Sequence, residues 1–144
     1  MQQQINSQIE GEFTGYNDGA IFKLTNGQVW QQSVYKYKYH YAYRPKVRIY
    51  PSDSGSYFME VDGVSDPVAV QQVTLATEGQ IKSDFNGYKQ GEKFQFQNGQ
   101  TWEQTENKYM YHYAHMPHAV VIDGINGFQI QVDGMEESVK VRRI

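Results

Sequence analysis

The residues best suited to ligand chemistry are five tyrosines at every second position of one short segment. They are Tyr35, Tyr37, Tyr39, Tyr41 and Tyr43, and they alternate with Lys36, Lys38, His40, Ala42 and Arg44. Alternate residues of a β-strand point to opposite faces, so the spacing predicts phenols on one face and mostly cations on the other. Such a row could stack on a sugar or a base, or pack on a partner. It could equally cover an interface between two parts of the chain, or the open end of a barrel.

A run of basic residues overlaps the same segment. It comprises Lys36, Lys38, Arg44, Lys46 and Arg48, with no acid between them. Cations interleaved with aromatic rings are typical of single-stranded nucleic-acid or polyanion binding. The whole chain, however, carries a net charge of −3 and so has no overall attraction for nucleic acid or an anionic membrane. Polyanion binding through residues 35–48 is therefore the alternative hypothesis, with nucleic acid disfavoured as a partner.

Three histidines spaced three apart suggest a metal site. They are His112, His115 and His118, and zinc needs three or four convergent ligands. On a strand this spacing sends neighbours to opposite faces, and Pro117 argues against a helix. We therefore expect no metal or cofactor, and keep the three histidines as a second alternative. His40 and His112 each lie between two tyrosines, and we expect each to bond a tyrosine or a backbone group.

Motifs for catalysis are missing from the sequence. It has no cysteine, and it shows no Ser-His-Asp order, no phosphate-cradling glycine loop and no His-Glu zinc motif. Its acids at positions such as Asp62 and Asp133 belong to Asp-Gly turn pairs. The sequence therefore favours a protein that is not an enzyme.

The elements that must position these residues occur twice. Placing Ile9 on Ile81 aligns residues 22–32 with 94–104 and residues 37–42 with 109–114. Trp, His, Pro and Asn-Gly recur in the same order, which predicts a tandem duplication. We place the two repeats at 1–73 and 77–144, joined by a short connection around residues 74–79. Units this small are marginal alone, so we expect the repeats to pack against each other.

Period-two alternation of apolar and polar residues predicts short antiparallel strands and no helix. The alternating segments are residues 9–13, 22–24, 46–50, 57–61 and 68–70. Asn26-Gly27 predicts a tight turn, and Gly15 and Gly87 predict bulges or corners. Trp30 and Trp102 are expected in the core, each with its indole N–H bonded to a carbonyl. The expected fold is all-β: two tandem antiparallel SH3-like barrels of five to six strands each.

Two motifs carry a resemblance to a known group. Residues 26–32 read NGQVWQQ and residues 39–47 read YHYAYRPKV. Over nearly all of both copies the chain resembles a small bacterial SH3-like domain with these motifs, which has no assigned activity and transfers no catalytic residue. Copy two departs from the pattern at residues 115–118, so a site built on Arg-Pro-Lys would survive only in copy one. The resemblance implies a periplasmic or envelope setting with a removed export signal, the cytoplasm being the alternative.

Together these observations predict a binding module whose partner is a protein or a component of the cell envelope. No apolar run is long enough to span a membrane, and we expect a monomer or a weak oligomer. The predicted ligand-binding residues are Tyr37, Tyr39, His40, Tyr41, Arg44, Lys46 and Arg48.

Overall fold

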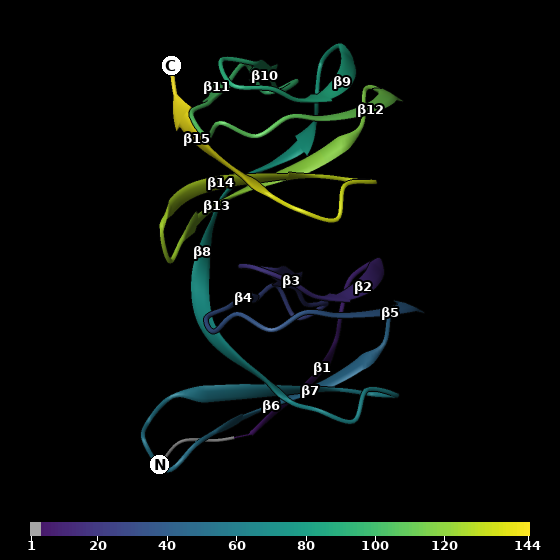
Figure 1. Cartoon of the computed structure of the whole chain (residues 1–144), viewed down its shortest axis with the longest axis vertical. Coiled ribbons are helices and arrows are strands. Elements are labelled where there is room, and N and C mark those ends of the chain that lie inside the picture. Colours follow the sequence, from purple (N-terminus) through teal and green to yellow (C-terminus); the bar gives the residue numbers. More distant parts are fainter. Residues whose placement is uncertain (1–3) are drawn as a thin grey trace. The chain divides into compact units, whose positions relative to one another are not determined.

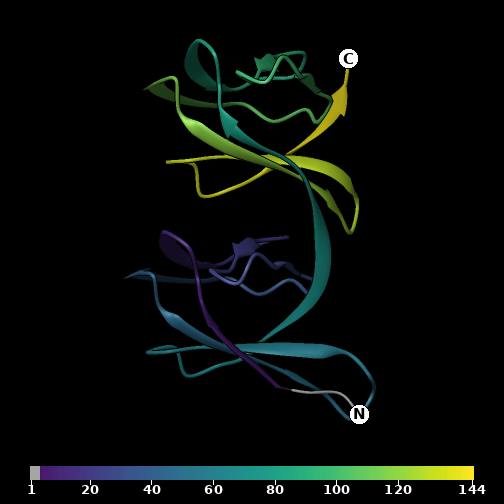
Figure 2. The same ribbon diagram turned by 180° about the vertical axis from the view of Figure 1, so that it is seen from behind.

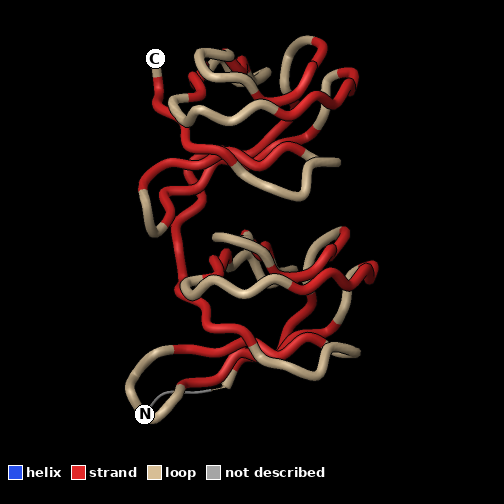
Figure 3. The backbone as a smooth tube through the Cα atoms, viewed as in Figure 1, coloured by secondary structure: helices blue, strands red, loops and turns tan. Residues whose placement is uncertain are grey.

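The computed structural model describes residues 4–144, and every regular element in that range is a β-strand. All the strand pairs are antiparallel. Figure 3 shows strands and loops only, and the described residues hold no helix that could cross a membrane. The prediction of an all-β antiparallel fold is confirmed.

The chain divides into two compact units, Met1–Val73 and Thr74–Ile144. The strands of unit one are β1 (Ile5–Gln8), β2 (Glu12–Tyr16), β3 (Ile21–Lys23), β4 (Val29–Gln32), β5 (Lys38–Tyr43), β6 (Lys46–Pro51) and β7 (Tyr57–Val61). Strand β8 (Val68–Gln80) belongs to both units. Those of unit two are β9 (Asp84–Tyr88), β10 (Lys93–Gln95), β11 (Thr101–Gln104), β12 (Met110–His115), β13 (His118–Gly124), β14 (Gly127–Val132) and β15 (Val139–Arg143).

The strands of each unit pair in the same order. In unit one the order is β1-β6-β7-β8-β4-β3, and in unit two it is β8-β13-β14-β15-β11-β10. Figures 1 and 2 show β1 running beside β6 in unit one. Each unit adds a separate two-stranded ribbon, β2 with β5 and β9 with β12. Long-range antiparallel pairing therefore builds both units.

No sheet in residues 4–144 closes into a barrel. The two ends of each strand path meet at a single isolated bridge, Ile9 with Leu24 in unit one and Ile81 with Phe96 in unit two. Backbone hydrogen bonds flank each bridge, such as that from the Glu10 N–H to the Lys23 carbonyl at 2.8 Å. The SH3-like barrel expected from the sequence therefore stays a prediction.

Residues 74–79, expected to be a short connection between the repeats, join the two units as part of strand β8. Val29 to Gln32 of β4 pair with Val70 to Val73, and His118 to Asp123 of β13 pair with the part of β8 that follows. Figure 1 shows β8 running without a break from one unit into the next. From Val68 to Thr77 the chain has no Gly, Pro, Asn or Asp, so no turn residue interrupts the strand.

The continuity of β8 predicts where unit two must begin. A fragment starting at residue 77 loses the pairs that Thr74 and Leu75 form with Asp123 and Ile122. We expect fragment 74–144 to be more stable than 77–144 by about 1–2 kcal/mol, the net worth of one or two hydrogen bonds. Urea unfolding followed by circular dichroism measures the difference. Equal midpoints would show that the first residues of the strand contribute nothing.

Each unit has its own aromatic core. In unit one the Phe13 ring lies 6.0 Å from Tyr16 and 6.1 Å from Phe22, and unit two repeats the arrangement with Phe85, Tyr88 and Phe94. Trp30 and Trp102 are buried as predicted. Their indole N–H groups donate to side-chain carbonyls, those of Gln28 at 3.1 Å and Gln100 at 3.3 Å.

The buried tyrosines make the fold sensitive to alkali. Tyr16 donates to the Asp66 carbonyl at 2.9 Å, and burial followed by the nearby Asp66 charge raises its pKa from 10.0 to about 12. Burial also raises the pKa of Tyr88, whose hydroxyl donates to the Glu137 carbonyl. Because the folded pKa is the higher one, the stability from the neutral phenol is complete below pH 10 and is lost as pH rises towards 12.

We therefore expect the free energy of unfolding to fall by on the order of 2 kcal/mol per phenol over this range. The variant carrying Tyr16→Phe and Tyr88→Phe has no buried phenol to ionise, so its stability should fall less steeply than that of the wild type. Denaturant unfolding at a series of pH values compares the two slopes. Parallel slopes would rule out these phenols as the source of the alkaline loss.

Gly15 lies beside an irregularity, as the sequence predicts. The pairing of β2 with β5 shifts between Phe13 and Gly15, and β5 carries the extra residue. The ribbon of β9 and β12 has the same shift next to Gly87. The strand before this bulge is shorter than predicted: of residues 9–13 only the end is in β2, which begins at Glu12 after a bend.

Candidate binding face

The tyrosines of the alternating segment are exposed within their own units. Each unit carries one such row, and we use the name tyrosine face for the row of either unit: Tyr35, Tyr37, Tyr39, Tyr41 and Tyr43 in unit one, and Tyr109, Tyr111 and Tyr113 in unit two. Exposure of these side chains ranges from 52% for Tyr41 to 72% for Tyr109. The face follows β5 in unit one and β12 in unit two, with its first residues in the preceding loop. No other part of the same unit covers these rings.

The strand that carries the face begins at Lys38, three residues later than predicted. The preceding segment is loop (Figure 3), and the buried Gln32 side chain holds it in place. The Nε2 group of Gln32 donates to the carbonyls of Val34 and Lys36, both at 3.0 Å, while its Oε1 accepts from the Asn17 N–H. These backbone groups therefore bond a side chain in place of a neighbouring strand, and Tyr35 and Tyr37 are exposed in this loop.

Gln104 makes the matching hydrogen bonds in unit two. Its Nε2 donates to the carbonyls of Glu106 at 2.9 Å and Lys108 at 2.8 Å, and its Oε1 accepts from the Lys89 N–H at 2.7 Å. The sequence interpretation missed both glutamines. Their recurrence at the end of the aligned NGQxWxQ segments was the available signal.

The other side of β5 faces the core of unit one and is not a basic surface. His40 lies 6.4 Å from the Phe13 ring and beside Gly63, and Ala42 packs against the core. No hydrogen bond from His40 to a tyrosine or a backbone group is found in residues 4–144, in contrast to the expectation. The Lys36 ammonium donates to the Pro67 carbonyl at 3.0 Å. His40 is thus separated from the tyrosine face by the strand itself.

The remaining predicted ligand residues lie beyond the face. Arg44 is exposed in the turn after β5 and adopts a positive φ of 51°. Lys46 and Arg48 are on β6, where Arg48 pairs with Glu60 and lies 4.8 Å from the Tyr50 ring centre. Of the predicted set, the structure brings Tyr37, Tyr39 and Tyr41 together and places the other four residues elsewhere.

An acidic residue faces the row in unit two. The register pairs Asp84 of β9 with His115 of β12, and the Asp84 Oδ1 lies 2.7 Å from the His115 Nδ1. The Asp84 charge, with a hydrogen bond to the same carboxylate, raises the pKa of the Tyr113 hydroxyl. Glu12 takes the same place opposite Tyr43 in unit one. Sequence spacing could not reveal these neighbours, because they depend on the register across a bulge.

The three histidines of copy two do not converge. His112 lies against Phe85 and Gly134, on the core side of β12. His115 contacts Asp84, while His118 approaches Glu78 through Nε2 at 3.1 Å and Asp133 through Nδ1 at 3.7 Å. Within residues 4–144 no group of three histidine or acidic side chains is arranged to hold a metal ion.

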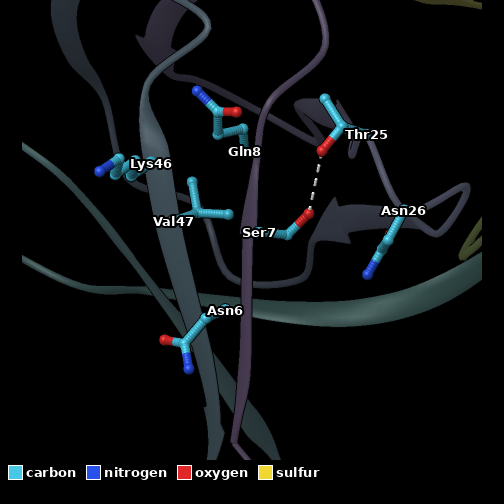
Figure 4. A pocket seen from close by; sticks show the side chains of 7 residues that line it. All are labelled: Asn6, Ser7, Gln8, Thr25, Asn26, Lys46 and Val47. Carbon is cyan, nitrogen blue, oxygen red and sulfur yellow. Dashed lines mark hydrogen bonds between the residues drawn. The ribbon is translucent and has the colours of Figure 1, made fainter.

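A shallow, open groove in unit one is a separate feature (Figure 4). Its lining comes from β1, β6 and the turn after β3, and comprises Asn6, Ser7, Gln8, Thr25, Asn26, Lys46 and Val47. The hydroxyls of Ser7 and Thr25 lie 3.4 Å apart across it. An open depression buries little of a small ligand, so the groove is a poorer candidate than the tyrosine face.

Comparisons of the chain with protein-family models, with curated proteins and with solved structures give no match.

Proposed function

We propose that the protein is a non-enzymatic binding module whose tyrosine face contacts a protein or a component of the cell envelope. The observation that carries the proposal is the exposure of eight phenols in two repeated rows. Large exposed aromatic patches are uncommon on surfaces that bind nothing, and tyrosine is enriched where partners meet. Gln32 and Gln104 also support the proposal, because each holds the loop before a row in place with three hydrogen bonds.

The alternative of polyanion binding through residues 35–48 receives less support. Lys36 and Arg48 are bonded to Pro67 and Glu60 within unit one. In unit two Lys108 bonds Glu106 at 3.4 Å and Glu137 at 3.2 Å. A polyanion would have to compete with these contacts for the cations that it needs.

We also propose that each unit is an SH3-like barrel, and that the two arose by duplication. The matching strand orders support the duplication. The bridges from Ile9 to Leu24 and from Ile81 to Phe96 support the barrel, because they bring the two ends of each strand path together. On such a barrel the ribbon of β2 and β5 would present the row on the outside.

A retention experiment tests the proposed function. The full chain is immobilised and exposed to cytosolic and envelope fractions of the native bacterium, beside a variant carrying Tyr39→Ala, Tyr41→Ala, Tyr111→Ala and Tyr113→Ala, which changes the rows of both units, and a Lys38→Glu, Lys46→Glu variant. All three must first show the same circular dichroism and unfolding midpoint. We expect a partner that the tyrosine variant loses and the lysine variant keeps. Equal retention by all three proteins would refute a role for the face.

A further inference from the structure

We infer that the tyrosine face binds an uncharged, β-1,4-linked polysaccharide chain by stacking its sugar rings on the phenols. This inference rests on the proposed function and names the class of ligand. Each row is long and narrow: alternate strand residues are about 6.8 Å apart, so Tyr39 to Tyr43 of β5 span at most roughly 14 Å, and the exposed Tyr35 and Tyr37 precede them in the loop. A ligand that contacts the whole row must itself be extended. A compact small molecule could contact only part of it.

The chemistry of the row favours sugars over an apolar protein surface. From position 35 to 43, each outward residue is a tyrosine, and the row of unit two adds Asn107 and His115 to its three tyrosines. No aliphatic side chain interrupts either row. A phenol offers an apolar ring face and a hydroxyl at its edge, whereas a pyranose offers an apolar C–H face and a rim of hydroxyls. The two fit each other without either partner burying an unpaired polar group.

The charges beside the row favour an uncharged chain. The acids Asp84 and Glu12 lie opposite the last residues of the rows, His115 and Tyr43. Carboxylates repel a polyanion, but they accept hydrogen bonds readily from sugar hydroxyls. The Lys36 ammonium is turned away to the Pro67 carbonyl. A nucleic acid or an anionic glycan would therefore meet a carboxylate beside each row, and the exposed Arg44 follows the end of the row in unit one.

The linkage follows from the shape of the platform. A β-1,4-linked chain of glucose or N-acetylglucosamine units is extended and presents ring faces along its length. An α-1,4-linked glucan coils, so that successive rings turn away from one line. The row of phenols can stack on several rings of the first polymer at once and on few of the second. Affinity should then rise with the number of sugar rings until the row is covered.

Isothermal titration of the full chain with cello- and chito-oligosaccharides, from the disaccharide to the hexasaccharide, tests the inference. We expect affinity to rise with length, to be insensitive to salt, and to exceed that for maltohexaose. The variant carrying Tyr39→Ala, Tyr41→Ala, Tyr111→Ala and Tyr113→Ala should weaken binding at least about tenfold, since loss of two stacked rings in each unit removes more than 1.4 kcal/mol per site. The same four tyrosines changed to phenylalanine keep their ring faces, and this variant should weaken binding much less.

Three outcomes would overturn the inference. One is no binding of either oligosaccharide series; another is equal binding by the alanine variant. The third is stronger, salt-sensitive binding of a single-stranded oligonucleotide or heparin. The retention experiment distinguishes a failure of the sugar inference from a failure of the proposed function. If the alanine variant still loses its envelope partner, only the sugar inference fails. If retention is also unchanged, the proposed function fails with it.

Discussion

Gly87→Ala is expected to unfold unit two under conditions in which the wild type is folded. A Cβ at this position would lie 2.0 Å from the Met110 carbonyl oxygen and 2.8 Å from the His112 amide nitrogen. Both are backbone atoms of the facing strand, so no side-chain rearrangement can make room. The φ of 105° adds a strain that a residue with a Cβ rarely tolerates. We expect a loss of about 3–5 kcal/mol, because the bulge that joins β9 to β12 must open.

Gly99→Ala is the matched control for this substitution. Its φ of 91° is also positive, but a Cβ there would have no neighbour within 4 Å. The free energy of unfolding of this variant should fall by only about 1 kcal/mol, because backbone strain is the only cost. Hydrogen exchange read by mass spectrometry follows the amides of β9 and β12 separately from those of β2 and β5. Equal loss of protection in the two variants would show that the close approach of the strands is not what requires glycine.

Gln32→Met is expected to lower the stability of unit one by about 2–4 kcal/mol. Methionine fills nearly the same volume, so the change removes hydrogen bonds without opening a large cavity. The substitution removes the three hydrogen bonds that the Gln32 side chain makes with the Asn17 N–H and the carbonyls of Val34 and Lys36, and a hydrogen bond contributes a net of about 0.5–1.5 kcal/mol. The loop before β5 should loosen, which would take Tyr35 and Tyr37 out of the row.

Gln28→Met is the control, since Gln28 accepts one side-chain hydrogen bond, from the Trp30 indole. We expect the urea midpoint of unfolding of the Gln32→Met variant to be well below that of Gln28→Met. The Gln32 variant should also hold its partner less tightly than the wild type at temperatures where it is still folded. If its stability matched that of the control, the three contacts would not be what holds the loop.

Local patterning was enough to predict some of the strands. Tyr57 to Val61 alternate in the sequence and form β7 with those bounds, because one side of that strand packs on the core of unit one. Asn26-Gly27 predicted the turn between β3 and β4, where Gly27 donates to the Leu24 carbonyl at 3.1 Å. Such features depend on neighbours along the chain, and the sequence displays them directly.

Features set by distant partners were harder to predict. The alternation of residues 35–43 indicated one strand, but Gln32 supplies the partners of residues 34 and 36, so pairing begins at Lys38. Of the cations that alternation placed on a second exposed face, Lys36 and Lys38 are half-buried, and Arg44 lies in the turn after β5. The approach of Asp84 to His115 arises from register across a bulge, which no spacing within one strand encodes.

Covalent labelling of tyrosines, read by mass spectrometry with and without the envelope fraction that contains the partner, tests the central claim most directly. The full chain has 12 tyrosines, and the buried Tyr16 and Tyr88 serve as internal references that should stay unlabelled throughout. We predict that Tyr39, Tyr41 and Tyr113 label readily in the free protein and are protected when the partner binds. Unchanged labelling of the tyrosine face in a protein that has demonstrably bound its partner would contradict the account and place the binding surface elsewhere.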